Sequence, residues 1–262
     1  MLKGLYTAYT GMIQEQKRMD TLANNLANAD TTGFKKEGLT SQSFDSVLVD
    51  KIRDDSDPYR FARRIGQANP GVKIGESYTD FSEGSLQVTD VPMDFAIGGK
   101  GFFMVEFTNK AGEDATFYTR DGNFQMTKDG YLVTTDGDFV LGKKGSGTER
   151  IKLDPTKEVV ADAQGYLFQD GKKVAQFQLT DFADYNYIEH YGENYYYPVE
   201  GAEQIEADGQ IFQGYLETSN VQVVSEMVQM IAVSRQYEAN QKVIQTYDTS
   251  LQTATQLGRL QG

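Results

Sequence analysis

Cysteine and tryptophan are absent from this 262-residue sequence, and histidine occurs once, as His190. The lack of cysteine excludes disulfides and thiol catalysis. A single histidine excludes a histidine-rich metal cluster and leaves little room for histidine-dependent acid–base chemistry. The sequence has no apolar run of about 18 residues, so no membrane-spanning helix is expected. The first residues, MLKGLYTAYTGMIQEQ, lack the apolar core and the small-residue cleavage site of a secretory signal, so a conventional cleaved signal is not expected.

Negative charge is in excess, and it is concentrated in the middle of the chain. The formal net charge is −13 at pH 7, which argues against non-specific binding to nucleic acid and to anionic membranes. Residues 1–28 contain three basic and two acidic side chains, and residues 219–262 contain three of each. The two ends of the chain are therefore nearly uncharged, whereas the segment between them is strongly acidic.

Both ends of the sequence have the periodicity of a long amphipathic helix, with apolar residues at alternating intervals of three and four, the spacing of a heptad seam. The first seam consists of Leu2, Leu5, Tyr9, Met12, Gln16, Met19, Ala23 and Leu26. The second seam consists of Met230, Val233, Tyr237, Asn240, Ile244, Tyr247, Leu251 and Ala254, after a helix start signal at Ser219–Asn220. We expect the two helices to pair as a coiled coil. Packing of each seam on the rest of the chain is the alternative.

Residues outside the two seams are mostly uncharged. In residues 241–257, QKVIQTYDTSLQTATQL, nine residues are Gln, Thr or Ser, whereas a solvated coiled coil usually carries Glu and Lys beside its seam. Asn24, Asn25 and Asn28 are expected to point away from the first seam. Neutral hydrogen-bonding surfaces suit helices that pack against many identical copies, where like charges would meet repeatedly. The local alternative is that these asparagines only end the helix before Gly33.

The middle of the sequence has the period of β-strands. Alternating apolar and polar residues in 117–142 are interrupted by Asp121–Gly122, Asp129–Gly130 and Asp136–Gly137, and Asp–Gly between alternating runs is a strong hairpin signal. Two later turns are expected at Asp170–Gly171 and Asp208–Gly209. These signals predict a central, mainly antiparallel β domain.

The predicted fold class is therefore α+β, with N- and C-terminal helices pairing as a coiled coil and a central antiparallel β domain. Residues 1–35 and 217–262 form a discontinuous helical assembly domain in this interpretation. Residues 36–84 are mixed in charge and weakly periodic, and we interpret them as an extended connector with at most a few short strands or a short helix. Residues 85–216 form the central β domain.

Motifs for catalysis or cofactor binding are weak. GKKGSGT (142–148) lacks the Gly-Lys-Ser/Thr ending of a phosphate loop. GGKGFF (98–103) lacks the third glycine of a dinucleotide-binding fingerprint and begins a strand. The acidic residues Asp54, Asp55 and Asp57 lack the central glycine and terminal glutamate of a calcium loop. No catalytic residue, cofactor or metal is predicted, although 38 carboxylates leave a glycosidase-type acidic pair possible in principle.

Three segments together resemble the flagellar rod and hook protein family. YTAYTGMIQEQKRMDTLANNLANADTTGFK is similar to the N-terminal signature of that family, and GYLETSNVQVVSEMVQMIAVSRQYEANQKVIQTYDTSLQ is similar to its C-terminal signature. The central GFFMVEF and FYTRDGNFQMTKDGYLVTTDG resemble the family's β module. In its length and its central segment, the chain resembles the distal rod protein or its close proximal-rod relative, and the two remain alternatives.

The resemblance implies a non-enzymatic subunit of the flagellar basal-body rod. Its partners would be further copies of itself in a helical homopolymer, other rod and hook proteins, and the flagellar type III export apparatus, without nucleic acid or membrane insertion. It would be exported unfolded without signal cleavage, and its paired end helices would line the inner tube of a shaft that transmits torque. The assembly motif that the resemblance implies consists of Asn24, Asn25, Asn28, Gly33, Phe34, Glu217, Thr218, Ser219 and Asn220.

Two other functions are left open by the residues themselves. One is a carboxylate-dependent hydrolase of cell-wall glycan, which needs a concave site with two close acidic residues. The other is a secreted filament subunit outside flagella, which would share the same assembly physics.

Overall fold

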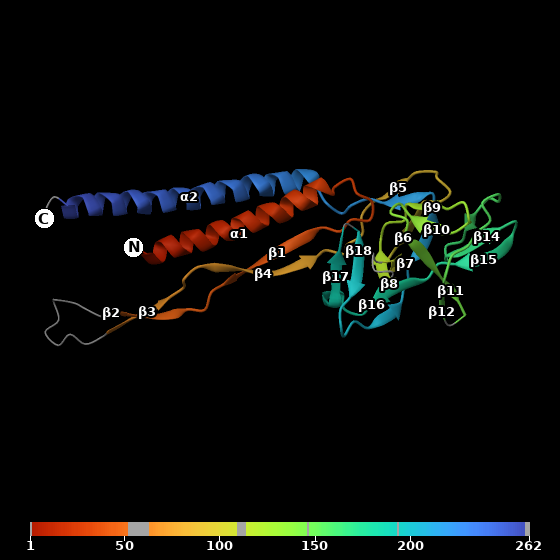
Figure 1. The fold of residues 1–262 in the computed structure, drawn as a ribbon, viewed down its shortest axis with the longest axis horizontal. Helices are drawn as coiled ribbons and strands as arrows, with labels where there is room; N and C mark the ends of the chain where they lie inside the picture. The colour runs from red at the N-terminus through yellow and green to blue at the C-terminus, as the bar shows by residue number, and fades with distance from the viewer. Residues whose placement is uncertain (1, 52–62, 109–113, 146, 193, 260–262) are drawn as a thin grey trace. The chain divides into compact units, whose positions relative to one another are not determined.

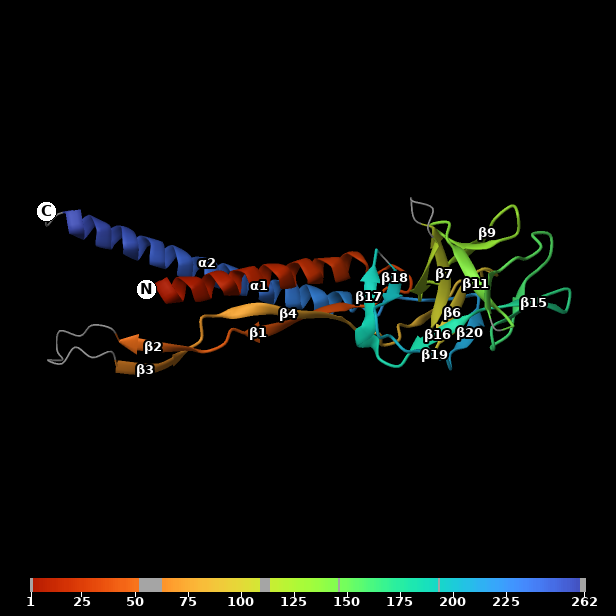
Figure 2. The same cartoon turned by 60° about the horizontal axis from the view of Figure 1, so that its bottom comes forward.

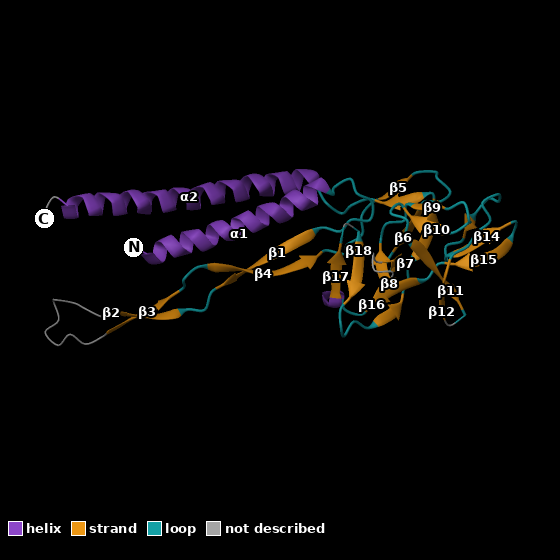
Figure 3. Cartoon of the chain, viewed as in Figure 1, coloured by secondary structure: helices purple, strands orange, loops and turns teal. Residues whose placement is uncertain are grey.

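The computed structural model describes residues 2–51, 63–108, 114–145, 147–192 and 194–259. The chain forms two compact units. The helical unit comprises Met1–Leu26, Glu37–Thr79 and Gln222–Gly262, and the β unit comprises Ala27–Lys36 and Asp80–Val221. The fold class is α+β, as predicted, with a helix near each end of the chain and a large antiparallel β unit (Figure 3). No helix among the described residues is long and apolar enough to cross a bilayer.

The helical unit contains two long helices and a ribbon of paired strands (Figures 1 and 2). Helix α1 spans Leu2–Ala27 and helix α2 spans Val223–Arg259. Strand β1 (Glu37–Ser43) pairs antiparallel with β4 (Val72–Thr79), and β2 (Val47–Lys51) pairs antiparallel with β3 (Arg63–Ala68). Where the structure describes it, the segment interpreted as an extended connector is thus mostly a two-stranded ribbon.

The ribbon touches α1 through polar side chains. The Thr7 hydroxyl donates to the Pro70 carbonyl oxygen at 3.2 Å, and the Gln14 amide donates to the Ser41 hydroxyl. Gly71 lies so close to α1 that a Cβ there would meet the Thr10 hydroxyl oxygen at 2.2 Å. Glycine at position 71 therefore permits the close approach of ribbon and helix.

The β unit consists of short strands connected mainly by tight turns. In chain order they are β5 (Leu86–Val88), β6 (Phe95–Gly98), β7 (Phe102–Thr108), β8 (Asp114–Thr119), β9 (Phe124–Met126), β10 (Leu132–Thr134), β11 (Phe139–Lys144), β12 (Gly147–Arg150), β13 (Val160–Ala161), β14 (Tyr166–Gln169), β15 (Lys172–Gln176), β16 (Leu179–Phe182), β17 (Ile188–Tyr191), β18 (Tyr195–Pro198), β19 (Gln204–Glu206), β20 (Gln210–Gln213) and β21 (Tyr215–Glu217), with a 3₁₀ turn at Tyr185–Tyr187.

The largest sheet of this unit has the strand order β17-β18-β8-β7-β11-β10-β9, with β12 paired to β11 and β16 paired to both β7 and β19. Strands β13, β14 and β15 form a smaller sheet, and β20 pairs with β6 and β21 with β5. Every pairing in the unit is antiparallel. The predicted strand orientation is therefore confirmed.

Three of the predicted Asp–Gly hairpins are confirmed. Asp129–Gly130 joins β9 to β10, Asp136–Gly137 joins β10 to β11, and Asp170–Gly171 joins β14 to β15, each between strands that pair with each other. Asp170 and Gly171 have φ angles of 51° and 72°, the left-handed conformation that a type I′ turn requires.

The other two Asp–Gly pairs are not hairpin turns. Asp121–Gly122 follows β8, which pairs with β7 and β18, and precedes β9, which pairs with β10. A Cβ on Gly122 would lie 1.5 Å from the Phe95 carbonyl oxygen, so glycine is needed here for a close backbone approach. Asp208–Gly209 likewise connects β19 to β20, which pair with β16 and β6.

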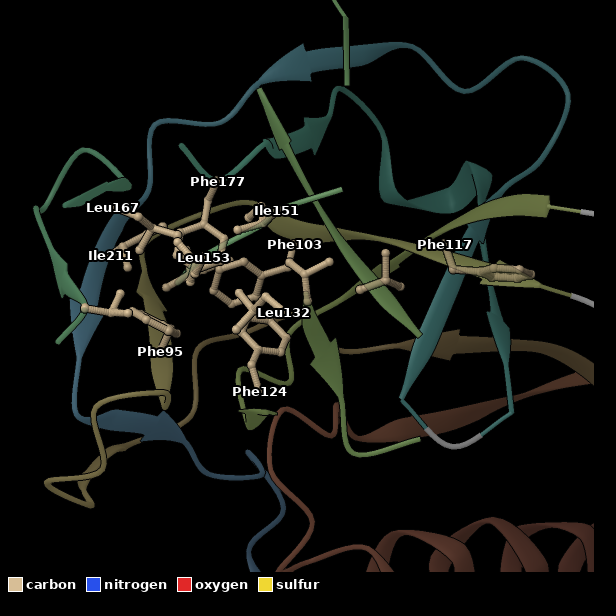
Figure 4. Close-up of a cluster of buried hydrophobic side chains, with 14 of the residues drawn as sticks. Phe95, Phe103, Phe117, Phe124, Leu132, Ile151, Leu153, Leu167, Phe177 and Ile211 are labelled. Carbon is tan, nitrogen blue, oxygen red and sulfur yellow. The ribbon is translucent and has the colours of Figure 1, made fainter. Parts of the chain in front are cut away.

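Aromatic and aliphatic side chains from both ends of the β unit's sequence form its main core (Figure 4). Phe95, Phe103, Phe124 and Phe177 have ring centroids 4.9–6.2 Å apart. Such tilted and edge-on contacts add to the free energy gained from apolar burial. Ile211, which comes shortly before the end of the unit, is buried in the same cluster.

Candidate functional site

Side chains of α2 contact α1, and the order of the contacts along α2 is the reverse of their order along α1. A Cβ on Gly4 would meet the Tyr247 hydroxyl at 2.1 Å, and a Cβ on Gly11 would meet the Asn240 amide nitrogen at 3.1 Å. Asn240 and Tyr247 are large side chains seven residues apart, and glycine provides the room for each of them. The two helices are therefore antiparallel.

The same register continues toward the start of α2. The Gln236 amide lies beside the Glu15 carboxylate, with a nitrogen–oxygen distance of 3.1 Å in the orientation that lets the nitrogen donate. From one contact to the next, the residue number rises on α1 and falls by the same amount on α2. The contact is thus a regular one along the whole of α1.

The residues predicted for the α2 seam are the less exposed ones over most of that helix. Val233 is 2% exposed. Met230, Tyr237, Asn240, Ile244 and Tyr247 are half-buried, whereas Leu251 and Ala254 are exposed.

On α1, the residues that face α2 lie one position before the predicted seam. The seam residues Leu5, Met12, Met19 and Leu26 are half-buried, and Tyr9, Gln16 and Ala23 are exposed. The side of α1 that meets α2 instead carries Gly4, Gly11 and Asn25 together with the buried Ala8 and Leu22, so α2 does not lie over the predicted seam.

Asn25 lies outside the predicted seam, as expected, but it points into the contact with α2 and is not part of an outward-facing surface. Its side chain is fully buried. Its amide nitrogen donates to the Glu37 carbonyl oxygen at 2.8 Å and to the Glu226 carboxylate at 3.4 Å, and its amide oxygen accepts from the Glu37 N–H at 3.0 Å. Asn24 is exposed and Asn28 is half-buried, where its oxygen accepts from the Thr31 hydroxyl. Asn25 therefore joins α1, the start of α2 and strand β1.

The remaining predicted motif residues meet inside the β unit. Residues 31–36, which follow α1 in the chain, lie against residues 217–220, which precede α2, and both contact residues 80–85 and 120–121. We call this set of segments the clasp. It brings together residues that are up to about 190 positions apart in the sequence.

Glu217 is the centre of the clasp. Its carboxylate is 1% exposed and accepts from the Lys35 ammonium at 2.5 Å, from the Arg120 guanidinium at 3.3 Å and from the Gly84 N–H at 2.9 Å. Lys35 and Arg120 are also buried. Lys35 donates in addition to the Ser82 carbonyl oxygen at 2.8 Å, and Arg120 donates to backbone carbonyls before β7. The carboxylate thus neutralises part of two buried positive charges.

Thr218 and Asn220 extend the clasp through backbone groups. The Thr218 N–H and hydroxyl both donate to the Ser85 carbonyl oxygen at 2.9 Å. The Asn220 oxygen accepts from the Lys36 N–H at 2.8 Å, and its nitrogen donates to the Asp80 carbonyl oxygen at 2.8 Å. Because its amide is used in this way, Asn220 does not begin the helix, and α2 begins at Val223. The Ser219 hydroxyl accepts from the Val221 N–H at 3.3 Å.

Gly33 and Phe34 fit the clasp for steric reasons. Gly33 has a φ of +69°, and its N–H donates to the Glu217 carbonyl oxygen at 2.8 Å. A Cβ at Gly33 would lie 2.5 Å from the Asp121 backbone nitrogen, so only glycine fits. Phe34 is 1% exposed and meets His190 edge-on, which makes His190 a packing residue.

Burial shifts the pKa of two groups in the clasp. Desolvation lowers the pKa of Lys35, although the Glu217 carboxylate opposes this shift. Desolvation raises the pKa of Asp121, and the hydrogen bond donated by the Thr32 hydroxyl opposes it. These groups are unsuited to exchanging protons with a substrate, because Lys35, Arg120 and Glu217 are enclosed by protein. It is suited to holding segments together.

Lys35 and Arg120 were not singled out in the sequence, although they are central to the clasp. Each is one charged residue among many, and their common partner Glu217 lies 182 and 97 positions away. The available signal was weak: a charged residue directly follows the apolar Phe34, and another directly follows the buried end of strand β8.

The acidic clusters give no support for a metal or a hydrolytic site. Among the described residues, no group of three His, Cys, Asp or Glu side chains could hold a metal ion. Asp54, Asp55 and Asp57 lie outside the described residues. One surface pocket contains Glu206 and Asp208, but Lys143 donates to Glu206 at 2.7 Å and lowers the pKa of Glu206. A general acid of a glycosidase needs the opposite shift.

Comparison with protein families gives three matches that together cover much of the chain. Residues 5–35 match the family described as flagella basal body rod protein. Residues 96–176 match the flagellar hook protein FlgE/F/G D1 domain, and residues 213–257 match the flagellar basal body rod FlgEFG protein C-terminal family. The first and last matches contain all the clasp residues that the sequence had singled out.

Curated proteins are similar over the full length. The flagellar basal-body rod protein FlgG of Bacillus subtilis is 32% identical over 280 residues, which cover 99% of this chain and 100% of that protein. FlgG of Caulobacter vibrioides is 32% identical over 278 residues, with 98% and 99% coverage. The flagellar basal-body rod protein FlgF of Caulobacter vibrioides is 33% identical over 263 residues, with 99% and 100% coverage.

Proposed function

The chain belongs to the family of flagellar basal-body rod proteins and is a structural subunit, not an enzyme, and within this role we propose that α1 and α2 pair as a coiled coil through which copies of the chain assemble. The assembly would be a helical tube that transmits torque from the motor to the hook. Family membership does not favour the alternative of a cell-wall hydrolase.

The observation that carries the proposal is the exposure of α2. This helix has 37 residues, yet Glu226 and Val233 are its only buried residues among those described. Isolated helices in water are marginal without a covered apolar face. Val224, Val228 and Ile231 are exposed near its start. Much of the burial that would stabilise α2 is therefore expected to come from other copies.

The neutrality of the end segments supports assembly with identical copies. The net negative charge of the chain lies entirely within residues 29–218, and acidic surfaces of neighbouring copies repel each other. Helices that carry Gln, Thr and Ser instead of Glu and Lys can approach without this cost. The seam residues that would take part in contacts between copies are Leu5, Tyr9, Met12, Met19, Leu26 and Leu251. Met230, Tyr237, Ile244 and Tyr247 lie on the side of α2 that meets α1, and they would support the helix pair itself.

The clasp would serve the assembly by joining the segment that follows α1 to the segment that precedes α2. Residues 31–36 come shortly after α1 and residues 217–220 come shortly before α2, and Glu217 joins them through Lys35. The clasp would therefore hold together the chain segments that lead out of α1 and into α2. This proposal assigns Gly33, Phe34, Glu217, Thr218, Ser219 and Asn220 to anchoring.

The expected partners are further copies of the chain, other rod and hook proteins, and the flagellar export apparatus, and the expected location is the basal body. Export would occur without cleavage of a signal. Relatives of similar identity include both FlgG and FlgF, so the distal and the proximal segment of the rod both remain candidate positions.

Electron microscopy of isolated basal bodies tests this function. A tag inserted at Gly145, a loop glycine with open space around it, is expected to label the rod between the motor and the hook. Label confined to surface filaments other than flagella would contradict the rod assignment and favour the alternative of a non-flagellar filament. Restored motility in a strain that carries only the tagged chain is the control for function.

A further inference from the structure

Each helix of the helical unit carries a short row of exposed apolar side chains. On α1 the row consists of Tyr6, Tyr9 and Ile13, which are between 37% and 62% exposed. On α2 the row consists of Val224, Val228 and Ile231, which are between 54% and 76% exposed. Each row covers two turns of helix.

The two rows lie on opposite outer sides of the helix pair. A helix turns by about 100° per residue, which places Tyr6, Tyr9 and Ile13 on the side of α1 opposite to Gly4 and Gly11. Those glycines meet α2. The same reckoning places the α2 row on the side of that helix opposite to the residues that meet α1, which include Asn240 and Tyr247. One helix pair therefore presents an aromatic-rich row on one side and an aliphatic row on the other.

The spacing of the rows is complementary when they are read in opposite directions. The steps from Ile13 to Tyr9 and from Tyr9 to Tyr6 are four and three residues, and so are the steps from Val224 to Val228 and from Val228 to Ile231. An α1 helix that lies antiparallel against an α2 helix can thus match all three positions at once. Antiparallel is also the orientation in which α1 and α2 meet within one chain.

We propose that the α1 row of one copy docks on the α2 row of the next copy, with Ile13 on Val224, Tyr9 on Val228 and Tyr6 on Ile231. This inference rests on the proposed function and names the surface through which assembly occurs. The occupant is a second copy because the chain itself supplies the matching row, with the same length and spacing. Neither row contains a charge, so neither side must desolvate an ion on docking.

The geometry of this contact generates an open array. The two rows are different surfaces on opposite sides of one unit, so the contact is heterologous and each copy leaves one row free for the next. Within a chain, Tyr9 is level with residues about 14 positions beyond Val228 on α2. At 1.5 Å per residue, successive copies are therefore displaced by about 20 Å along the helices. A displaced heterologous contact builds a helical arrangement and not a flat ring.

Cysteine cross-linking of the full-length chain tests the contact. Because the natural chain has no cysteine, every disulfide must form between introduced residues. The double variant Tyr9→Cys/Val228→Cys, concentrated and oxidised, is expected to give a ladder of covalent dimers, trimers and longer species on denaturing gels. A mixture of the two single variants is expected to give dimers only. Each single variant alone is expected to remain monomeric on the gel, because the rows are not self-complementary in this register.

The matched control is Gln16→Cys/Val228→Cys, in which the α1 cysteine is also exposed but lies two turns away. It is expected to give no ladder. Sedimentation of the same samples distinguishes a failure of the proposed contact from a failure of assembly. Polymer that sediments without the Tyr9/Val228 ladder would overturn the proposed contact and leave assembly intact. Dimers of a single variant, or an equal ladder from the control, would also overturn it. If neither polymer nor cross-linked species formed at any concentration, the proposed function would be overturned as well.

Discussion

Replacing Glu217 with alanine is expected to lower the free energy of unfolding of the β unit by about 3–5 kcal/mol, the usual cost of removing one partner from a buried ion pair. The substitution leaves the ammonium of Lys35 and the guanidinium of Arg120 buried without their shared carboxylate. It also removes the acceptor of the Gly84 N–H. Urea unfolding followed by tyrosine fluorescence measures the change.

Glu206→Ala is the matched control for that substitution. Glu206 also accepts from a lysine, Lys143, at a distance of 2.7 Å, but its side chain is 79% exposed. Exposed pairs of this kind contribute little to stability, so no measurable change in the urea midpoint is expected. If both alanine variants changed the midpoint equally, or if Glu217→Ala left it unchanged, the clasp would not be the structural centre of the β unit.

Gly33→Ala is expected to destabilise the β unit by about 3 kcal/mol or more, through a backbone clash added to an unfavourable φ angle. A Cβ at this position would lie 2.5 Å from the Asp121 nitrogen and 2.6 Å from the Arg120 carbonyl carbon. Backbone atoms cannot move aside as a side chain can. Relief of the clash would displace residues 31–36 from Glu217. Thermal unfolding and the rate of proteolysis within residues 27–36 are the measurements.

Gly171→Ala isolates the contribution of the φ angle. Gly171 has a φ of +72°, close to the +69° of Gly33, but a Cβ there meets nothing within 4 Å. The expected loss is about 1–2 kcal/mol, the cost of placing an alanine in the left-handed region. Similar losses for the two variants would mean that residues 31–36 can shift freely, which contradicts the clasp.

Local patterns in the sequence predicted the parts of the fold that depend on neighbouring residues. The apolar periodicity at both ends predicted α1 and α2, and Asp129–Gly130, Asp136–Gly137 and Asp170–Gly171 predicted three hairpins. Each of these signals acts over a few residues, through the helical repeat or through the φ angles of a turn. The ribbon formed by β1 and β4 was weakly signalled, because Leu39 is the one large apolar residue of β1 and alternation is limited to Val72, Ile74 and Tyr78 of β4.

The side of α1 that meets α2 could not be read from periodicity. The seam through Leu5, Met12 and Met19 identifies the apolar side of the helix, but a partner in the same chain and a partner in another copy give the same pattern. In this chain Gly4 and Gly11 receive the large side chains of α2, so α2 meets a different side of α1 from the predicted seam. Glycine adds nothing to an apolar pattern, although it allows a neighbouring helix to approach more closely.

The clasp was not predicted from the sequence. The resemblance selected Gly33, Glu217 and Asn220 as members of an assembly motif, and the structure places all three in contacts within the β unit. Lys35 and Arg120 were missed because pairing across about 100–180 residues leaves no local pattern. Long-range ion pairs become visible only once the backbone brings their segments together.

Hydrogen exchange of the full-length chain, measured as a dilute monomer and again as a sedimented polymer, tests the central claim that burial of the end helices comes from other copies. The account predicts that amides of residues 2–22 and 230–257 exchange rapidly in the monomer and slowly in the polymer, while the core strands β7, β8 and β11 are protected in both. Strong and equal protection of both helices in a proven monomer would contradict it.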